Sequence, residues 1–345
     1  MRAESGILFN ANFASAYMKK CAYRIAGLCM GVLLGGLIAC QDDTRTPSKP
    51  AESPAIIRAE VAVPVFNADS AFYFTERQVQ FGPRVPNTAA HRACATWLIN
   101  RLKATGAQVI TQPATVTAYN GTKLQIQNII ASYNPAQKRR IMLTAHWDTR
   151  PVADQDDERQ SEPIPGANDG ASGVGVLLEI ARLLQQQAPT IGVDIILWDG
   201  EDYGNSSVED SYCLGSQYWA ANKHALDYVA LYAVNLDMVG AAGAFFPREG
   251  HSMQYAASTV DKIWKTAERL GYNQYFAAFR SDPIIDDHFY ISSKGGIPAV
   301  DIIDQPEGRG FFEHWHTHGD DMRTISRETL KAVGQTLLTV VYNEL

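Results

Sequence analysis

Four apolar runs of the sequence are each followed by acidic or imidazole side chains. A fifth candidate site is Asp169, which stands in a glycine-rich turn that precedes an expected helix. Carboxylates and imidazoles that are buried together repel and desolvate one another unless a cation pairs with them. Histidine combined with carboxylates, without a cluster of cysteines, indicates a zinc site of the open, catalytic type. The candidate residues are His146, Asp148, Asp169, Asp199, Glu201, Asp202, Asp237, His316 and His318.

The adjacent acids Glu201 and Asp202 could divide two tasks between them. Gly200 precedes them and allows the chain to turn, so that one carboxylate binds a metal ion while the other faces a substrate. A carboxylate beside a metal-activated group is a candidate general acid and base. The alternative is a solvated acidic loop, because Glu209 and Asp210 lie close by in the sequence.

These residues need strands that end at one edge of a sheet. Strand-like runs occupy residues 124–132, 140–147, 193–198, 228–236 and 297–303, and several are the continuous apolar runs of strands buried on both faces. Helical patterns occupy residues 88–105, 171–187, 216–222, 258–270 and 326–343. This alternation predicts an α/β fold, a three-layer α/β/α sandwich with a mixed, mostly parallel central sheet. In such sheets ligands bind beyond the carboxyl ends of the strands, where the candidate residues fall.

The N-terminal region has the pattern of a bacterial lipoprotein signal peptide. Basic residues precede an uncharged apolar run, which at about 15 residues is shorter than the roughly 20 that a spanning helix needs. The run ends in Leu-Ile-Ala-Cys, which resembles the box in which a signal peptidase cuts before a lipid-modified cysteine, here Cys40. The basic residues follow Met18, which is therefore the expected translation start. A buried apolar helix is the alternative, but the polar, proline-rich residues 41–54 are typical of a tether.

The expected organisation is a signal peptide at residues 1–39, a lipidated tether at residues 40–70 and one catalytic domain at residues 71–345. We expect the protein to be held at the bacterial cell envelope by a lipid anchor at Cys40, facing the periplasm or the cell exterior. The net charge of −7 argues against a nucleic-acid partner, because phosphate binding needs a basic surface. Cys94 and Cys213 remain in the catalytic domain and could pair or stay separate thiols.

The order of the candidate residues resembles the zinc-dependent aminopeptidase family of metallopeptidases. The family's pattern is His-x-Asp, Asp in a glycine-rich turn, Glu-Glu or Glu-Asp, Asp after a strand and a late His-Thr. It matches residues 146–148, 169, 201–202, 237 and 316–317. Within that family the chain is most similar to the glutaminyl cyclases, through residues 80–86, 198–202, 210–216, 285–288 and 315–317. The resemblance covers the chain from about residue 71 to its end and implies the family's phosphorylase/hydrolase-like sandwich.

The resemblance also implies an activity and a role for each matched residue. Glutaminyl cyclases convert the N-terminal glutamine of a peptide or protein into pyroglutamate and release ammonia, with one zinc ion as Lewis acid. Glu201 corresponds to the proton shuttle, and Asp237 and Asp286 to the acids that share a hydrogen-bond network with it. Trp315 corresponds to a residue that lines the glutamine pocket. The zinc ligands implied are Asp169, Asp202 and His316.

Two departures from the animal cyclases keep a second activity open. Asp202 stands where the animal enzymes have the longer Glu, although it remains an oxygen ligand. His146 is retained here, and in dinuclear aminopeptidases the corresponding His joins the residues matching Asp169 and Asp237 around a second zinc ion. The alternative activity is thus a two-zinc aminopeptidase that removes N-terminal residues from peptides. A lipid-tethered binding protein without catalytic activity is a third possibility, but no ligand position is lost.

Overall fold

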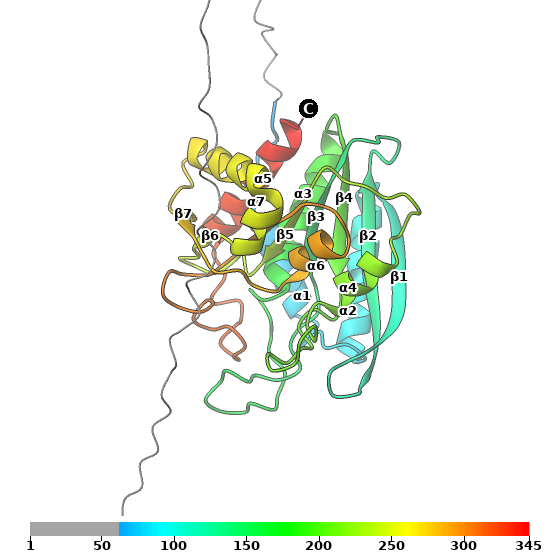
Figure 1. Cartoon of the computed structure of the whole chain (residues 1–345), viewed down its shortest axis with the longest axis vertical. Helices are drawn as coiled ribbons and strands as arrows, with labels where there is room; N and C mark the ends of the chain where they lie inside the picture. The colour runs from blue at the N-terminus through cyan, green and yellow to red at the C-terminus, as the bar shows by residue number, and fades with distance from the viewer. Residues whose placement is uncertain (1–61, 345) are drawn as a thin grey trace, which may run out of the picture. The chain divides into compact units, whose positions relative to one another are not determined.

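The described residues are built around a six-stranded sheet. The structure is a computed structural model that describes residues 62–344. The sheet contains β1 (Gln108–Thr117), β2 (Lys123–Tyr133), β3 (Arg140–His146), β4 (Gly192–Trp198), β5 (Ala233–Asp237) and β8 (Ala299–Ile303). Their order across the sheet is β1-β2-β4-β3-β5-β8 (Figure 1). Strands β4, β3, β5 and β8 are parallel, whereas β2 is antiparallel to both β1 and β4. The predicted mixed, mostly parallel sheet is confirmed.

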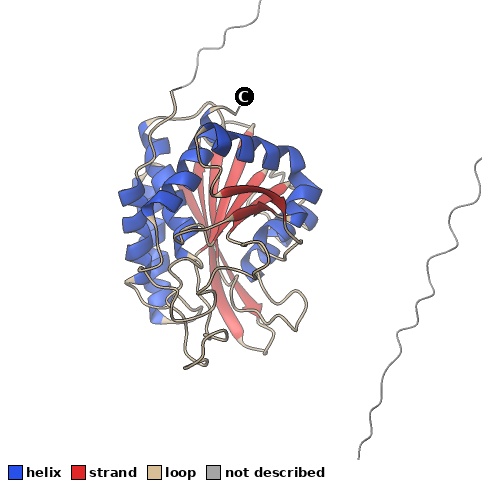
Figure 2. Ribbon diagram, turned by 90° about the vertical axis from the view of Figure 1, so that its left-hand side faces the viewer, coloured by secondary structure: helices blue, strands red, loops and turns tan. Residues whose placement is uncertain are grey.

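Helices cover both faces of this sheet (Figure 2). The larger core lies under α1 (Ala68–Val79), α2 (Ala89–Ala104), α3 (Ala171–Gln186), α5 (Gly250–Arg269) and α7 (Arg327–Tyr342). A smaller core on the opposite face lies under α4 (Leu214–Ala221) and α6 (Asp287–Ser293). A two-stranded sheet of β6 (Phe246–Arg248) and β7 (Phe276–Arg280) flanks α5. The predicted three-layer architecture is therefore confirmed.

The central strands follow from their apolar sequences. Every residue of β3 and of β4 is buried, as expected of parallel strands covered on both faces. Successive side chains point to opposite faces, so Leu143 belongs to the larger core while its neighbour Met142 packs in the smaller core with Trp219 of α4. Burial of both faces holds the ends of these strands in fixed positions.

Several elements differ from the expectations drawn from the sequence. The run at 228–236 becomes a strand only from Ala233, and β1 was missed because it is a partly exposed edge strand that contains Pro113. The helix expected at 258–270 begins earlier, at Gly250, because the Glu249 side chain accepts the backbone N–H groups of His251 and Ser252. The helices α1 and α6 were also missed, as were β6 and β7.

The packed body begins upstream of residue 71. Asn67 caps α1 by accepting the N–H of Ser70, and the Phe66 side chain is buried. Its ring lies against Gly334 of α7, where a methyl group would collide with it. The predicted signal peptide, the start at Met18, the lipid site at Cys40 and most of the predicted tether lie outside the described residues. Across residues 62–344, no helix combines the length and the apolar character that crossing a membrane requires.

Candidate active site

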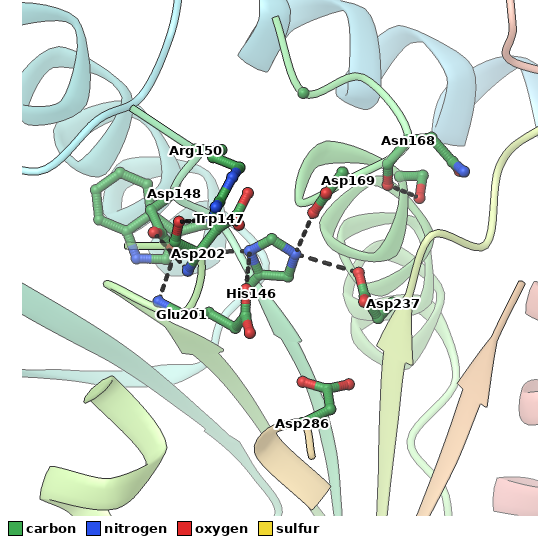
Figure 3. Close-up of polar contacts among 12 residues, drawn as sticks. His146, Trp147, Asp148, Arg150, Asn168, Asp169, Glu201, Asp202, Asp237 and Asp286 are labelled. Atoms are coloured by element: carbon green, nitrogen blue, oxygen red, sulfur yellow. Dashed lines mark hydrogen bonds and ion pairs between the residues drawn. The ribbon is translucent and has the colours of Figure 1, made fainter. Parts of the chain in front are cut away.

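The carboxyl ends of β3, β4 and β5 bring three groups of acidic and imidazole side chains together. His146 is the last residue of β3, Asp237 is the last residue of β5, and residues 199–202 follow β4. Asp169 comes from the turn before α3 and lies beside them (Figure 3). His316 joins from the loop that follows β8. The sequence prediction that these residues meet at one edge of the sheet agrees with this geometry.

His146 lies at the centre of the cluster. Its Nε2 is 3.1 Å from Oδ1 of Asp169 and 3.2 Å from Oδ1 of Asp237, while Nδ1 is 3.9 Å from Oε2 of Glu201 (Figure 3). Burial alone would lower the pKa of His146, but its carboxylate neighbours, Asp148 first among them, outweigh burial and raise that pKa well above its usual value. The ring is therefore held between carboxylates on two sides.

A second set of potential ligands consists of Asp169, Asp202 and His316, all buried. Nε2 of His316 is 3.2 Å from Oδ1 of Asp202 and 3.8 Å from Oδ2 of Asp169. Burial would lower the pKa of His316, but Asp202 and Asp154 raise it to about 9. Among the described residues, Oδ2 of Asp202 is a buried oxygen without a hydrogen-bond donor. An uncompensated buried carboxylate oxygen of this kind calls for a cation.

These distances can be compared with those of a zinc site. Four ligands at about 2.0–2.1 Å in a tetrahedral arrangement lie about 3.3 Å from one another. The separations of 3.2 Å and 3.8 Å around His316 fit that spacing. One nitrogen and two carboxylate oxygens form a donor set that zinc accepts, and three protein ligands leave a fourth position open. The residues present therefore fit a catalytic zinc ion.

Two buried acids hold the loops that carry these ligands. Asp148 accepts the backbone N–H groups of Glu201, at 3.1 Å, and of Asp202, at 3.3 Å, and so fixes the turn after β4 (Figure 3). Asp320 accepts the N–H group of Asp169 at 3.0 Å, and burial raises the pKa of Asp320 to about 8. Sequence reasoning placed Asp148 in the cluster but missed Asp320, which no strand end or spacing pattern marks.

Glu201 borders the cluster and keeps some access to solvent, with a side chain that is 13% exposed. Burial is the main cause that raises the pKa of Glu201 well above its usual value. Sγ of Cys213 lies 3.3 Å from Oε1 of Glu201, and Asp286 lies beside both. Asp237 contacts His146 rather than Glu201, so it adjoins Glu201 only through the imidazole. The contact with Cys213 was not predicted.

The loop after β8 also contains Trp315 and His318. The half-buried Trp315 ring stacks on His316, with centroids 3.7 Å apart and planes inclined by 23°. His318 instead contacts Asp156, with Nδ1 2.7 Å from Oδ2 of that carboxylate, which turns it away from the proposed ligands. Of the two histidines that could compete for a metal ion, His316 is the one that joins the cluster.

The two cysteines of the described region do not pair. Cys94 and Cys213 are both free and buried. Burial raises the pKa of Cys94 to about 12, so that its thiol stays protonated near neutral pH.

Comparison with known proteins identifies similar enzymes. A glutaminyl cyclase from Bacteroides thetaiotaomicron, solved with N-acetylhistamine bound, is 50% identical, with a TM-score of 0.81 over 82% of this chain and 100% of that chain. A leucine aminopeptidase precursor from the same organism is also 50% identical, with a TM-score of 0.80 over 83% of this chain and 100% of that chain. The glutaminyl-peptide cyclotransferase of Bos taurus is 24% identical over 291 residues, which cover 75% of this chain and 77% of that protein.

The family model described as peptidase family M28 matches residues 128–341. The match begins in β2 and extends into α7, so it includes every candidate zinc ligand and the strands that carry them. On this match and on the 50% identity to solved structures, the chain belongs to peptidase family M28.

Proposed function

We propose that this protein is a zinc-dependent glutaminyl-peptide cyclotransferase, which converts the N-terminal glutamine of peptides or proteins into pyroglutamate and releases ammonia. The observation that carries this proposal is the place of Glu201, a carboxylate with a raised pKa that borders a zinc-type donor set and still reaches solvent. Glutaminyl cyclases among the bacterial neighbours and the curated relatives support it.

Asp169, Asp202 and His316 are the proposed ligands of one zinc ion per chain. A zinc ion bound there supplies Lewis acidity, which makes the carbon of the glutamine side-chain amide more electrophilic. The Trp315 ring stacked on His316 offers a flat apolar wall, and we assign it to the pocket for the aliphatic part of the glutamine side chain.

Glu201 is the proposed proton carrier. As the α-amino nitrogen of the substrate bonds to the side-chain amide carbon, Glu201 accepts a proton from that nitrogen. Glu201 then donates a proton to the departing amide nitrogen, the bond between carbon and that nitrogen breaks, and ammonia leaves. A raised pKa suits this role, because the carboxyl group then holds the accepted proton more firmly than an ordinary Glu would until the amide nitrogen departs.

Asp286 is the proposed support for Glu201. It lies beside Glu201 and accepts a hydrogen bond from Nδ2 of Asn235 at 2.8 Å. Asp237 is proposed to act on the other side of His146, where it balances the charge of that imidazole. Repulsion between these neighbouring carboxylates favours protonation of at least one of them, which keeps a proton available at the site.

A dinuclear aminopeptidase is the second candidate function. The set of His146, Asp169 and Asp237 is complete, and one neighbour at 50% identity is a leucine aminopeptidase precursor. The separations of 3.1 Å and 3.2 Å around Nε2 of His146 would also suit a zinc ion. The glutaminyl cyclases among the bacterial neighbours and curated relatives nevertheless make the cyclase the first candidate. The number of zinc ions per chain distinguishes the two candidates.

Product analysis tests the proposed function. We expect glutaminyl peptides to release ammonia and lose about 17 Da without being shortened, as the balance of the proposed reaction requires. Leucine and alanine anilides serve as aminopeptidase substrates. Release of free amino acids from them, with no ammonia from glutaminyl peptides, would show that the second candidate is correct.

Glu201→Gln is expected to reduce kcat by about 10²- to 10⁴-fold, the usual contribution of general acid and base catalysis, because the amide cannot carry the proton. Zinc content should be unchanged. The matched control is Glu209→Gln, since Glu209 is exposed on the loop that follows. Ammonia release measured with each purified variant checks this, and an active Glu201→Gln enzyme would rule out the shuttle.

His316→Ala is expected to lose bound zinc, because one of three proposed ligands is removed. His318→Ala is the control, since His318 contacts Asp156 instead of the donor set. Metal analysis by mass spectrometry should give one zinc ion per wild-type chain, one for the control and less than one for His316→Ala. Two ions per wild-type chain would contradict the one-zinc proposal.

We also propose that a lipid at Cys40 attaches the enzyme to the bacterial cell envelope. The support is the basic and apolar sequence that precedes Cys40. Expression of Cys40→Ala in a bacterial host should move the protein from the membrane fraction to the soluble fraction. If both proteins fractionate alike, the anchor proposal is wrong.

A further inference from the structure

Arg150 lies behind the proposed zinc ligands and is almost completely buried, with a side chain that is 4% exposed. Its guanidinium contacts both oxygens of Asp154, with Nε 2.5 Å from Oδ1 and Nη2 3.0 Å from Oδ2. Its remaining nitrogen, Nη1, donates to Oδ1 of Asp202 at 3.2 Å and to the Asp202 carbonyl oxygen at 3.1 Å. One guanidinium therefore holds the proposed zinc ligand Asp202 and the carboxylate of Asp154 at the same time. Figure 3 labels Arg150 and Asp202.

Asp154 extends this contact to a second proposed ligand. Its Oδ1 lies 3.2 Å from Nδ1 of His316, the ring nitrogen opposite the one that faces Asp169 and Asp202. Within residues 62–344, this buried nitrogen makes no well-aligned hydrogen bond, and Asp154 is the carboxylate that lies beside it at ion-pair distance. The backbone N–H of Gln155 also donates to the carbonyl oxygen of His316 at 3.3 Å. The segment at 154–155 thus holds both the ring and the backbone of His316.

This geometry selects a tautomer of His316. A carboxylate beside Nδ1 favours a proton on that nitrogen, which leaves the lone pair of Nε2 free to bind a metal ion. The planar fork of Arg150 fixes the orientation of Asp154, a task that a lysine could not do with two parallel contacts. The partly exposed Asp154, whose side chain is 39% exposed, would otherwise be free to rotate into solvent.

We propose that Asp154 is a positioning residue that sets the zinc affinity of this protein by orienting His316, and that Arg150 holds it in place. The inference rests on the proposed zinc site of Asp169, Asp202 and His316. The acid-rich stretch from 154 to 162 then includes a part of the proposed metal centre. Asp156, two residues further along, contacts His318 and takes no part.

Asp154→Asn tests this inference, because it keeps the size of the side chain and removes its charge. The zinc dissociation constant of the full chain is measured by competition with a chromophoric chelator. We expect binding about 10- to 100-fold weaker than in the wild type, the usual effect of losing such an outer partner. Asp156→Asn, on the same loop, should bind zinc like the wild type. Asp154→Glu should restore part of the affinity, because it returns the carboxylate.

Melting temperatures in excess chelator separate zinc affinity from folding. We expect wild type and Asp154→Asn to melt alike without metal. Wild-type zinc affinity in Asp154→Asn would overturn the inference, as would a lower metal-free melting temperature combined with no restoration by Asp154→Glu. Wild-type affinity in His316→Ala would instead reject the zinc site itself, so failure of the proposed function can be recognised separately.

Discussion

Concentrated negative charge at one edge of the sheet is the constraint on which the rest of the structure depends. Asp169, Asp202 and Asp237 are buried there within reach of two imidazoles. Two carboxylates about 4 Å apart repel by about 4 kcal/mol at an effective dielectric constant of 20. That is a large fraction of the 5–15 kcal/mol by which a typical domain is stable. Protons, imidazolium groups, Arg150 or a metal ion must therefore offset the charge for the chain to fold.

The sheet makes this concentration possible because strands buried on both faces cannot shift. The ends of β3, β4 and β5 are fixed by the cores above and below them, and the loops that follow inherit those positions. Asp148 and Asp320 then hold two of these loops by accepting backbone N–H groups. Such acids stabilise backbone geometry rather than bind ligands, which explains why some carboxylates at the site have no direct part in the proposed chemistry.

The sequence predicts much of this arrangement, and the parts it misses share a physical cause. Runs such as 140–147 and 193–198 are mostly apolar along their length, so the sequence predicts both that they are strands and where they lie. Edge strand β1 and the short helix α6 owe their form to pairing and to capping by Asp286, neither of which appears as a hydrophobic pattern. Family resemblance named the proposed ligands and the grouping of His146 with Asp169 and Asp237, whereas the contacts of Cys213 with Glu201 and of Asp320 with the Asp169 N–H came only with the structure.

The same limit applies to the groups around the ligands. Arg150 and Asp154 are four residues apart on an irregular segment, and Cys213 reaches Glu201 from the start of α4. In each case an irregular turn brings the two side chains together. Such turns leave no periodic pattern in the sequence from which the contact could be predicted. The composition shows that acidic residues are abundant. Which of them face the cluster and which face water is seen only in the folded structure.

The carboxylate of Asp169 belongs to both donor sets, with Oδ1 toward His146 and Oδ2 toward His316. One side chain thus links two regions that could otherwise change independently during evolution. A substitution of Asp169 removes a ligand from both donor sets at once. Replacement of His146 or of His316 removes a ligand from one set only. Family members that differ in the number of metal ions they bind would therefore be expected to diverge at the histidines and to retain the shared acid.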